Sequence, residues 1–140
     1  MSKTLVRWAG TKTRFVVESG SGHSAEIDEP PLLGDDSGMR PTEMLLSALG
    51  GCSGVNAVLL LKKHRQRFSA LAVAVSGEQA EAWPRAFTSI EIEFQITWED
   101  GFQPDPELVE KALQMACEVY CPVHATLSAG TSLSHRLQKG

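Results

Sequence analysis

The sequence has little cysteine, few aromatic residues and no large excess of charge of either sign. Of its 140 residues three are Cys and 6% are aromatic, and 13 basic residues against 17 acidic ones leave a net charge of −4. Three cysteines are too few, and odd in number, for a disulfide-rich secreted domain, so we expect a reducing compartment. The N-terminal MSKTLVRWAG lacks the apolar run of a signal peptide. The sequence therefore predicts a cytoplasmic protein.

Basic residues do not form an extended cluster. The densest run is KKHRQR at residues 62–67, which fits the last turn of a helix, where cations interact favourably with the helix dipole. We therefore expect no nucleic-acid partner.

One 18-residue stretch, Met44–Leu61, carries no charge and reaches the minimum length of a membrane span. Six of these residues are Ser, Gly or Asn, so we expect a helix buried almost all round in a soluble core, and no membrane partner. Pro41 and Glu43 mark the start of this helix, which we expect to run to about Gln66. Its buried face is predicted from helical spacing as Leu45, Ala48, Leu49, Cys52, Val55, Asn56 and Leu59.

The remaining chain predicts a single α+β domain over residues 1–140, with the element order βββαββαβ and antiparallel sheet. Three short strands are expected within residues 4–28, followed by a loop over residues 29–39. Strict alternation from Ile90 to Trp98 predicts a half-buried strand, and residues 71–75 predict its neighbour. Asp105 and Pro106 begin a second helix, and Leu133, His135 and Leu137 alternate as a closing strand. The buried stripe of that second helix is predicted as Leu108, Val109, Ala112, Leu113, Ala116, Val119 and Tyr120.

Two cysteines at the ends of helical segments are the candidate reactive groups. Cys52 lies in the apolar run, where a thiol is usually inert packing, and Gly50, Gly51 and Gly54 surround it. Each Gly costs about 1 kcal/mol of helix stability relative to Ala, so we expect a close approach to the backbone, by a second helix or by a substrate. Cys121 precedes Pro122 and is expected at a helix end with an accessible thiol.

A metal site is the weaker alternative for this region. Cys117, Cys121 and His124 have the spacing i, i+4, i+7, which places three possible ligands on one helical face. Because Pro122 interrupts that face, we expect no metal, and we expect Cys117 to be a small, semi-buried residue.

The segments PTEMLLSALGGCSGVNAVLLLKKHRQ and ALQMACEVYCPVHATL, with the strand pair between them, resemble the OsmC/Ohr family and especially its YhfA-like branch. The resemblance implies an intertwined homodimer, with sheets wrapped around two central helices and two active sites at the interface. It also implies a reactive Cys at Cys52 and a resolving Cys at Cys121.

Hydroperoxide-specialised members place a Glu ten residues before the reactive Cys, where this chain has Thr42. Glu43 follows it and is either the supporting carboxylate or a first-turn residue that interacts with the helix dipole. For the supporting Arg, the candidates are Arg7, Arg14 and Arg40, and the N-terminal region favours Arg14.

The function implied by this resemblance is thiol-dependent reduction of organic hydroperoxides in oxidative-stress defence, without a bound cofactor and with an external dithiol as reductant. Cys52, Cys121, Glu43 and Arg14 are the expected catalytic residues. The alternative is an OsmC-like protein without efficient peroxidase activity that binds a small apolar ligand at the dimer interface. An unusually acidic Cys52 thiol would favour the peroxidase.

Overall fold

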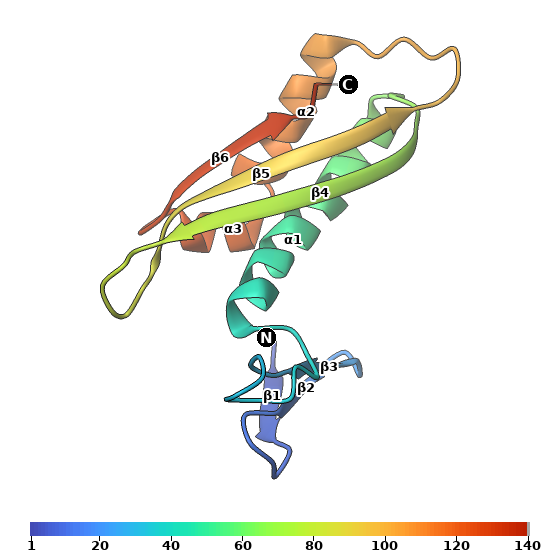
Figure 1. Cartoon of the computed structure of the whole chain (residues 1–140). Helices are drawn as coiled ribbons and strands as arrows, with labels where there is room; N and C mark the ends of the chain where they lie inside the picture. Colours follow the sequence, from blue (N-terminus) through green and yellow to red (C-terminus); the bar gives the residue numbers. More distant parts are fainter. Residues whose placement is uncertain (140) are drawn as a thin grey trace. The chain divides into compact units, whose positions relative to one another are not determined.

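The computed structural model describes residues 1–139, which contain six strands and three helices (Figure 1). In chain order these are β1 (Thr4–Trp8), β2 (Phe15–Ser19), β3 (Ser24–Ile27), α1 (Pro41–Lys63), β4 (Phe68–Gln79), β5 (Phe87–Trp98), α2 (Pro106–Glu118), α3 (Pro122–Leu127) and β6 (Ser132–Leu137). The order confirms the predicted α+β class, with α3 as a further short helix before the last strand. The chain divides into two compact units at Leu45/Leu46, which are described in turn. The expectation of a single domain stays a prediction.

The first unit, Met1–Leu45, contains an antiparallel sheet in the strand order β1-β2-β3. Gly22 supplies the left-handed backbone of the β2–β3 turn, with a φ of +87° that a side chain would disfavour. Within residues 1–45, all of them described, Asp28 and Gly34 are the buried residues. No apolar side chain of this unit is therefore buried in the chain.

The Asp28 carboxylate organises the loop that follows β3. Oδ1 accepts hydrogen bonds from Thr13 Oγ1 at 2.7 Å and from the Glu29 backbone N–H at 2.8 Å. Oδ2 accepts from Ser37 Oγ at 2.8 Å and from the backbone N–H groups of Asp35 at 3.0 Å and Ser37 at 3.2 Å. Hydrogen bonding, first of all from Thr13, holds the pKa of Asp28 well below its usual range. A fully buried charge is thereby paired with donors on both oxygens.

The second unit, from Leu46 onward, contains a sheet in the order β4-β5-β6. β4 and β5 form the antiparallel pair that the sequence predicts, with Val73 opposite Phe94 and Val75 opposite Ile92. The last strand differs from the prediction, because β6 runs parallel to β5, with Ile92 opposite His135. The helices α2 and α3 lie between these two strands in the chain and form the long crossover that a parallel pair requires.

All three helices lie on one face of this sheet (Figure 1). Strand β5 contributes Ile90, Ile92 and Phe94 to the core, each at most 2% exposed, which agrees with the predicted alternation. Helix α2 begins as expected, with Asp105 as N-cap accepting hydrogen bonds from the Glu107 and Leu108 backbone N–H groups at 3.1 and 3.3 Å. The buried α2 residues are Val109, Ala112, Leu113, Ala116 and Cys117.

The predicted stripe of α2 was wrong at its C-terminal end. Val119 and Tyr120 are exposed, whereas Cys117, expected to be only semi-buried, is completely buried. The reason is that α2 ends at Glu118, so the helical spacing that would place both residues over the sheet stops before them.

The predicted buried face of α1 was also wrong in part. Its buried residues are Leu49, Gly50, Ser53, Gly54, Ala57 and Leu61. Val55 and Leu59, which were placed on the buried face, are each 61% exposed. Gly50 and Gly54 face β4, since an added Cβ would lie 2.8 Å from Val75 Cγ2 at Gly50 and 3.2 Å from Val73 Cγ2 at Gly54. The predicted close approach is therefore made by a strand at Gly50 and Gly54, whereas nothing lies within 4 Å of a Cβ added at Gly51.

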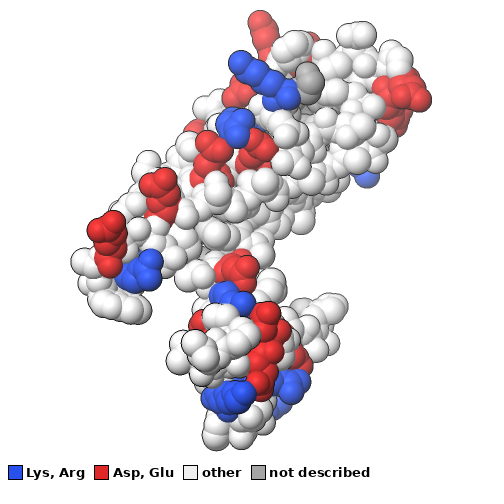
Figure 2. Space-filling model, viewed as in Figure 1, with Lys and Arg blue, Asp and Glu red and all other residues white. Residues whose placement is uncertain are grey.

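Helix α1 is long and apolar enough to cross a membrane by length and composition, with a mean hydropathy of 1.8 over its 18-residue window. The core helix of a soluble protein passes the same test, and 33% of this window is buried within the chain. On the face shown in Figure 2, acidic and basic side chains are interspersed among large uncharged areas. The part of the chain visible there shows no continuous basic surface.

Candidate functional site

Cys52 and Cys121 lie together in the second unit, although 69 positions separate them in the chain. Cys52 projects from the middle of α1 and is half-buried, and its thiol interacts with that of Cys121 and with the Val123 backbone. Cys121 begins α3. The turn between α2 and α3 thus brings the second thiol to the side of α1 that carries the first.

The position of Cys121 differs from the expected accessible helix end. Pro122 is the first residue of α3, and Cys121 is therefore an N-cap. Its Sγ accepts a hydrogen bond from the His124 backbone N–H at 3.3 Å, which turns the sulfur back onto the helix. The residue is only 3% exposed. The sequence indicated the helix boundary but assigned Cys121 to the preceding helix instead of the following one.

Burial, followed by the hydrogen bond with the Cys121 thiol, raises the pKa of Cys52, while the hydrogen bond with the Val123 backbone lowers it. The net direction is upward, because both larger effects favour the neutral thiol. Cys52 in this single chain is therefore not an unusually acidic thiol. A peroxidase reaction at Cys52 needs a further donor or cation that favours the thiolate.

The serine that follows Cys52 is a site residue that the sequence reasoning missed. Ser53 is completely buried, and its hydroxyl donates a hydrogen bond to Cys121 Sγ at 3.7 Å. One turn further along α1, Asn56 Nδ2 donates to the Ala116 carbonyl at 3.2 Å. These two polar side chains attach the end of α2 and the start of α3 to α1. The available signal was a hydroxyl residue adjoining Cys52 within a charge-free helix.

Cys117, the third cysteine, is buried near Ser53. Burial raises the pKa of Cys117 to about 11, and its hydrogen bond with Ser53 partly offsets this. The described residues hold no group of three or more His, Cys, Asp or Glu that could bind a metal ion. The single helical face predicted for Cys117, Cys121 and His124 does not exist, because α2 ends at Glu118 and α3 begins at Pro122.

The other two expected catalytic residues, Glu43 and Arg14, belong to the first unit. Glu43 Oε1 accepts a hydrogen bond from the Arg40 backbone N–H at 2.9 Å, a capping contact at the start of α1. Arg14 Nη2 donates to Glu26 Oε1 at 2.6 Å, and its buried Nε has no hydrogen-bond partner among the described residues. Arg40 pairs with Asp36 at 2.7 Å and Arg7 pairs with Glu18.

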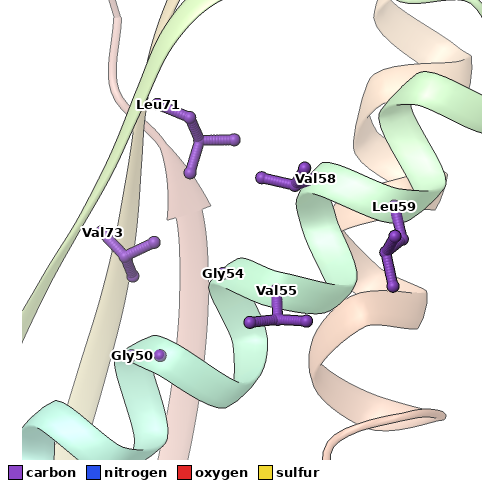
Figure 3. Close-up of a pocket in the computed structure, with 8 residues that line it drawn as sticks. Gly50, Gly54, Val55, Val58, Leu59, Leu71 and Val73 are labelled. Carbon is purple, nitrogen blue, oxygen red and sulfur yellow. The ribbon is translucent and has the colours of Figure 1, made fainter.

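An apolar groove lies between α1 and β4 in the second unit (Figure 3). It has a volume of about 480 Å³. Gly50, Gly51, Gly54, Val55, Val58 and Leu59 line it from the helix, and Leu71 and Val73 line it from the strand. All of these lining residues are Gly, Val or Leu, so the groove suits an apolar ligand or partner surface.

Comparison with known proteins relates the whole arrangement to one family. The family model described as OsmC-like protein matches residues 34–136. Protein YhfA of Escherichia coli strain K12 is 34% identical over 130 residues, which cover 93% of this chain and 92% of YhfA.

Solved structures share the fold. An OsmC-like protein of unknown function from Vibrio cholerae is 15% identical, with a TM-score of 0.82 over 99% of both chains. An organic hydroperoxide resistance protein OsmC from Legionella pneumophila is 12% identical, with a TM-score of 0.71 over 99% of this chain and 97% of that one. The family match and the YhfA similarity confirm the resemblance seen in the sequence: the chain belongs to the OsmC family.

Proposed function

We propose that this protein reduces organic hydroperoxides with Cys52 as the reactive thiol and Cys121 as the resolving thiol. The observation that carries the proposal is the position of Cys121, whose Sγ lies 3.7 Å from the hydroxyl of Ser53, the residue that follows Cys52 in α1. Family membership and the fold shared with an organic hydroperoxide resistance protein support a role in redox stress. A reducing intracellular compartment suits free thiols, and all three cysteines are free in the structure.

The reaction has two steps in which atoms and electrons balance. The Cys52 thiolate attacks the distal hydroperoxide oxygen, the O–O bond breaks, and the alkoxide takes a proton to leave as the alcohol. Cys52 is then a sulfenic acid. The Cys121 sulfur attacks the Cys52 sulfur, the S–O bond breaks, and hydroxide leaves as water after protonation. An external dithiol reduces the resulting disulfide.

The support for the Cys52 thiolate is part of the proposal. Because burial and Cys121 raise the pKa of Cys52 within the second unit, a cation is required to favour the charged form. The family resemblance assigns that role to an arginine of the N-terminal region, for which Arg14 is our candidate, with Glu43 as the residue that orients it. Arg14 keeps one buried donor, Nε, without a partner among the described residues.

We further propose that the functional form is a homodimer. Only a third of the apolar window of α1 is buried in one chain, and Val55 and Leu59 beside the groove are largely exposed. In the first unit, the apolar residues Leu5, Val6 and Trp8 are each at least half exposed. Monomeric proteins rarely leave apolar surface of this extent in water, and a second copy would cover it.

Single-turnover chemistry of cysteine variants tests the function. Cys52→Ser should abolish hydroperoxide consumption, because it removes the nucleophile. Cys121→Ser should consume hydroperoxide once and stop at a sulfenic or over-oxidised Cys52. Cys117→Ser is the matched control and should behave as the wild type. If Cys52→Ser consumes hydroperoxide at the wild-type rate, the proposal is wrong.

The second candidate function is binding of a small apolar ligand without efficient peroxidase activity. Two observations favour it: the apolar groove of about 480 Å³ and the raised pKa of Cys52. The rate of Cys52 alkylation at neutral pH separates the two functions. Labelling no faster than an ordinary thiol, with Cys52 unmodified by excess hydroperoxide, would favour the ligand-binding protein.

A further inference from the structure

Ser53 is buried in the core but makes a hydrogen bond that does not serve its own helix. A buried serine inside a helix commonly returns its hydroxyl to a carbonyl of the preceding turn. Here the hydroxyl donates instead to Cys121 Sγ, 68 positions away in the chain and 3.7 Å from Ser53 Oγ. Ser53 is completely buried, so this bond is not exchanged for one with water.

The same sulfur accepts a second hydrogen bond, from a residue that follows Cys121 in the chain. The His124 backbone N–H donates to Cys121 Sγ at 3.3 Å as part of the α3 cap. Two donors from different elements fix the Cys121 side chain in one orientation, beside the residue of α1 that follows Cys52. The cap contact belongs to the backbone, whereas the Ser53 contact depends on one side chain that can be changed.

We propose that Ser53 is a positioning residue for the resolving step. Its hydroxyl holds the Cys121 sulfur toward Cys52, so that Cys121 captures the Cys52 sulfenic acid before a second hydroperoxide oxidises it to the sulfinic acid. This inference rests on the proposed peroxidase function. It assigns to Ser53 no part in the first step, because the structure records no hydrogen bond between the Ser53 hydroxyl and Cys52 among the described residues.

The measurable quantity is the ratio of sulfinic acid to disulfide at Cys52. Purified, reduced protein is treated with increasing amounts of cumene hydroperoxide, quenched under denaturing thiol-blocking conditions and analysed by mass. The rate of the first step is measured separately as the loss of free Cys52 at limiting hydroperoxide. Thr and Val have the same shape, so the pair Ser53→Thr and Ser53→Val differs only in the hydroxyl, and Ser53→Ala avoids any added volume.

Ser53→Val and Ser53→Ala should raise the sulfinic-to-disulfide ratio by about threefold to tenfold, the effect of losing one hydrogen bond, with an unchanged first step. Ser53→Thr keeps the hydroxyl and should give the same sulfinic-to-disulfide ratio as the wild type. Asn56→Ala is the control for loosened packing, because Asn56 binds the Ala116 carbonyl and not the sulfur. It should leave the ratio unchanged.

Because Cys117 also lies near Ser53 and could compete with Cys121 for its hydroxyl proton, the comparison is repeated in a Cys117→Ala background, where the Ser53 effect should persist. The inference is overturned if Val and Thr variants give the same ratio, if Asn56→Ala raises it as much, or if Ser53→Ala slows the first step. Failure of the wild type to form any disulfide would instead contradict the proposed function.

Discussion

Gly50 of α1 lies against Val75 of β4 so closely that an added Cβ would be 2.8 Å from Val75 Cγ2. Gly50→Ala would gain about 1 kcal/mol of helix propensity but force this overlap, which costs about 1–3 kcal/mol in a packed core. Val75 is β-branched and cannot easily turn aside. We expect the overlap to dominate and lower the free energy of unfolding.

A double-mutant cycle measured by chemical denaturation checks this relationship. In a Val75→Ala background the overlapping methyl is absent, so Gly50→Ala should become neutral or stabilising. Equal destabilisation by Gly50→Ala in both backgrounds would show that Val75 is not the cause.

Cys117 gives a stability prediction at alkaline pH. Its pKa is raised from 9.0 to about 11 by burial, so the unfolded chain releases this proton at lower pH than the folded one. Stability is therefore lost as pH rises from 9.0 towards about 11. Cys117→Ala should show a shallower loss over that window in urea unfolding at a series of pH values. An identical slope in both proteins would contradict the burial of this thiol.

Asp28 predicts the opposite pH dependence in the first unit. Hydrogen bonds lower its pKa below the usual value of 3.8, so its contribution is present above that pH and is lost as the pH falls. Asp28→Asn retains the size but removes the charge and one acceptor, and we expect a clearly lower melting temperature at neutral pH. The difference between the two proteins should shrink in acid. A difference that stays constant from neutral pH to pH 2 would mean that the charge is not involved.

The exposed apolar residues of α1 test the homodimer. Burying Val55 or Leu59 against a second copy contributes about 1.5–3 kcal/mol, and each 1.4 kcal/mol is tenfold in affinity. Val55→Lys and Leu59→Lys should therefore each weaken the dimer at least about tenfold in analytical ultracentrifugation. Thr97→Lys, at an exposed β5 position, is the control and should leave it intact. A wild-type protein that is monomeric at micromolar concentration would contradict the proposed homodimer.

The local elements were predictable from sequence because their signals are local. Alternation from Ile90 to Trp98 and the Asp105–Pro106 start of α2 both depend on neighbouring residues, and the structure has them. The buried face of α1 was not predictable, because a helix that is apolar all round gives no periodic signal. The choice between its faces depends on the valines of β4, which are distant in the chain. The parallel direction of β6 likewise depends on the crossover through α2 and α3.

The candidate site, like the fold, was predictable from the sequence only in part. Cys52 and Cys121 could be singled out from their flanking residues and the family resemblance, and their catalytic roles stay predictions. The role of Ser53 could not be predicted, because its hydrogen bond to Cys121 joins residues 68 positions apart. Pro122 marked a helix boundary, but only the structure shows that Cys121 caps the helix after it.

The most direct test of the central claim is the location of the disulfide after one equivalent of organic hydroperoxide. The reduced protein, treated and quenched under denaturing thiol-blocking conditions, should lose about two mass units per chain, as expected when two thiols become a disulfide. Peptide mapping should place the bond between Cys52 and Cys121, with Cys117 still blocked as a free thiol. Unmodified Cys52 after excess hydroperoxide, or a bond that does not include Cys52, would contradict the account.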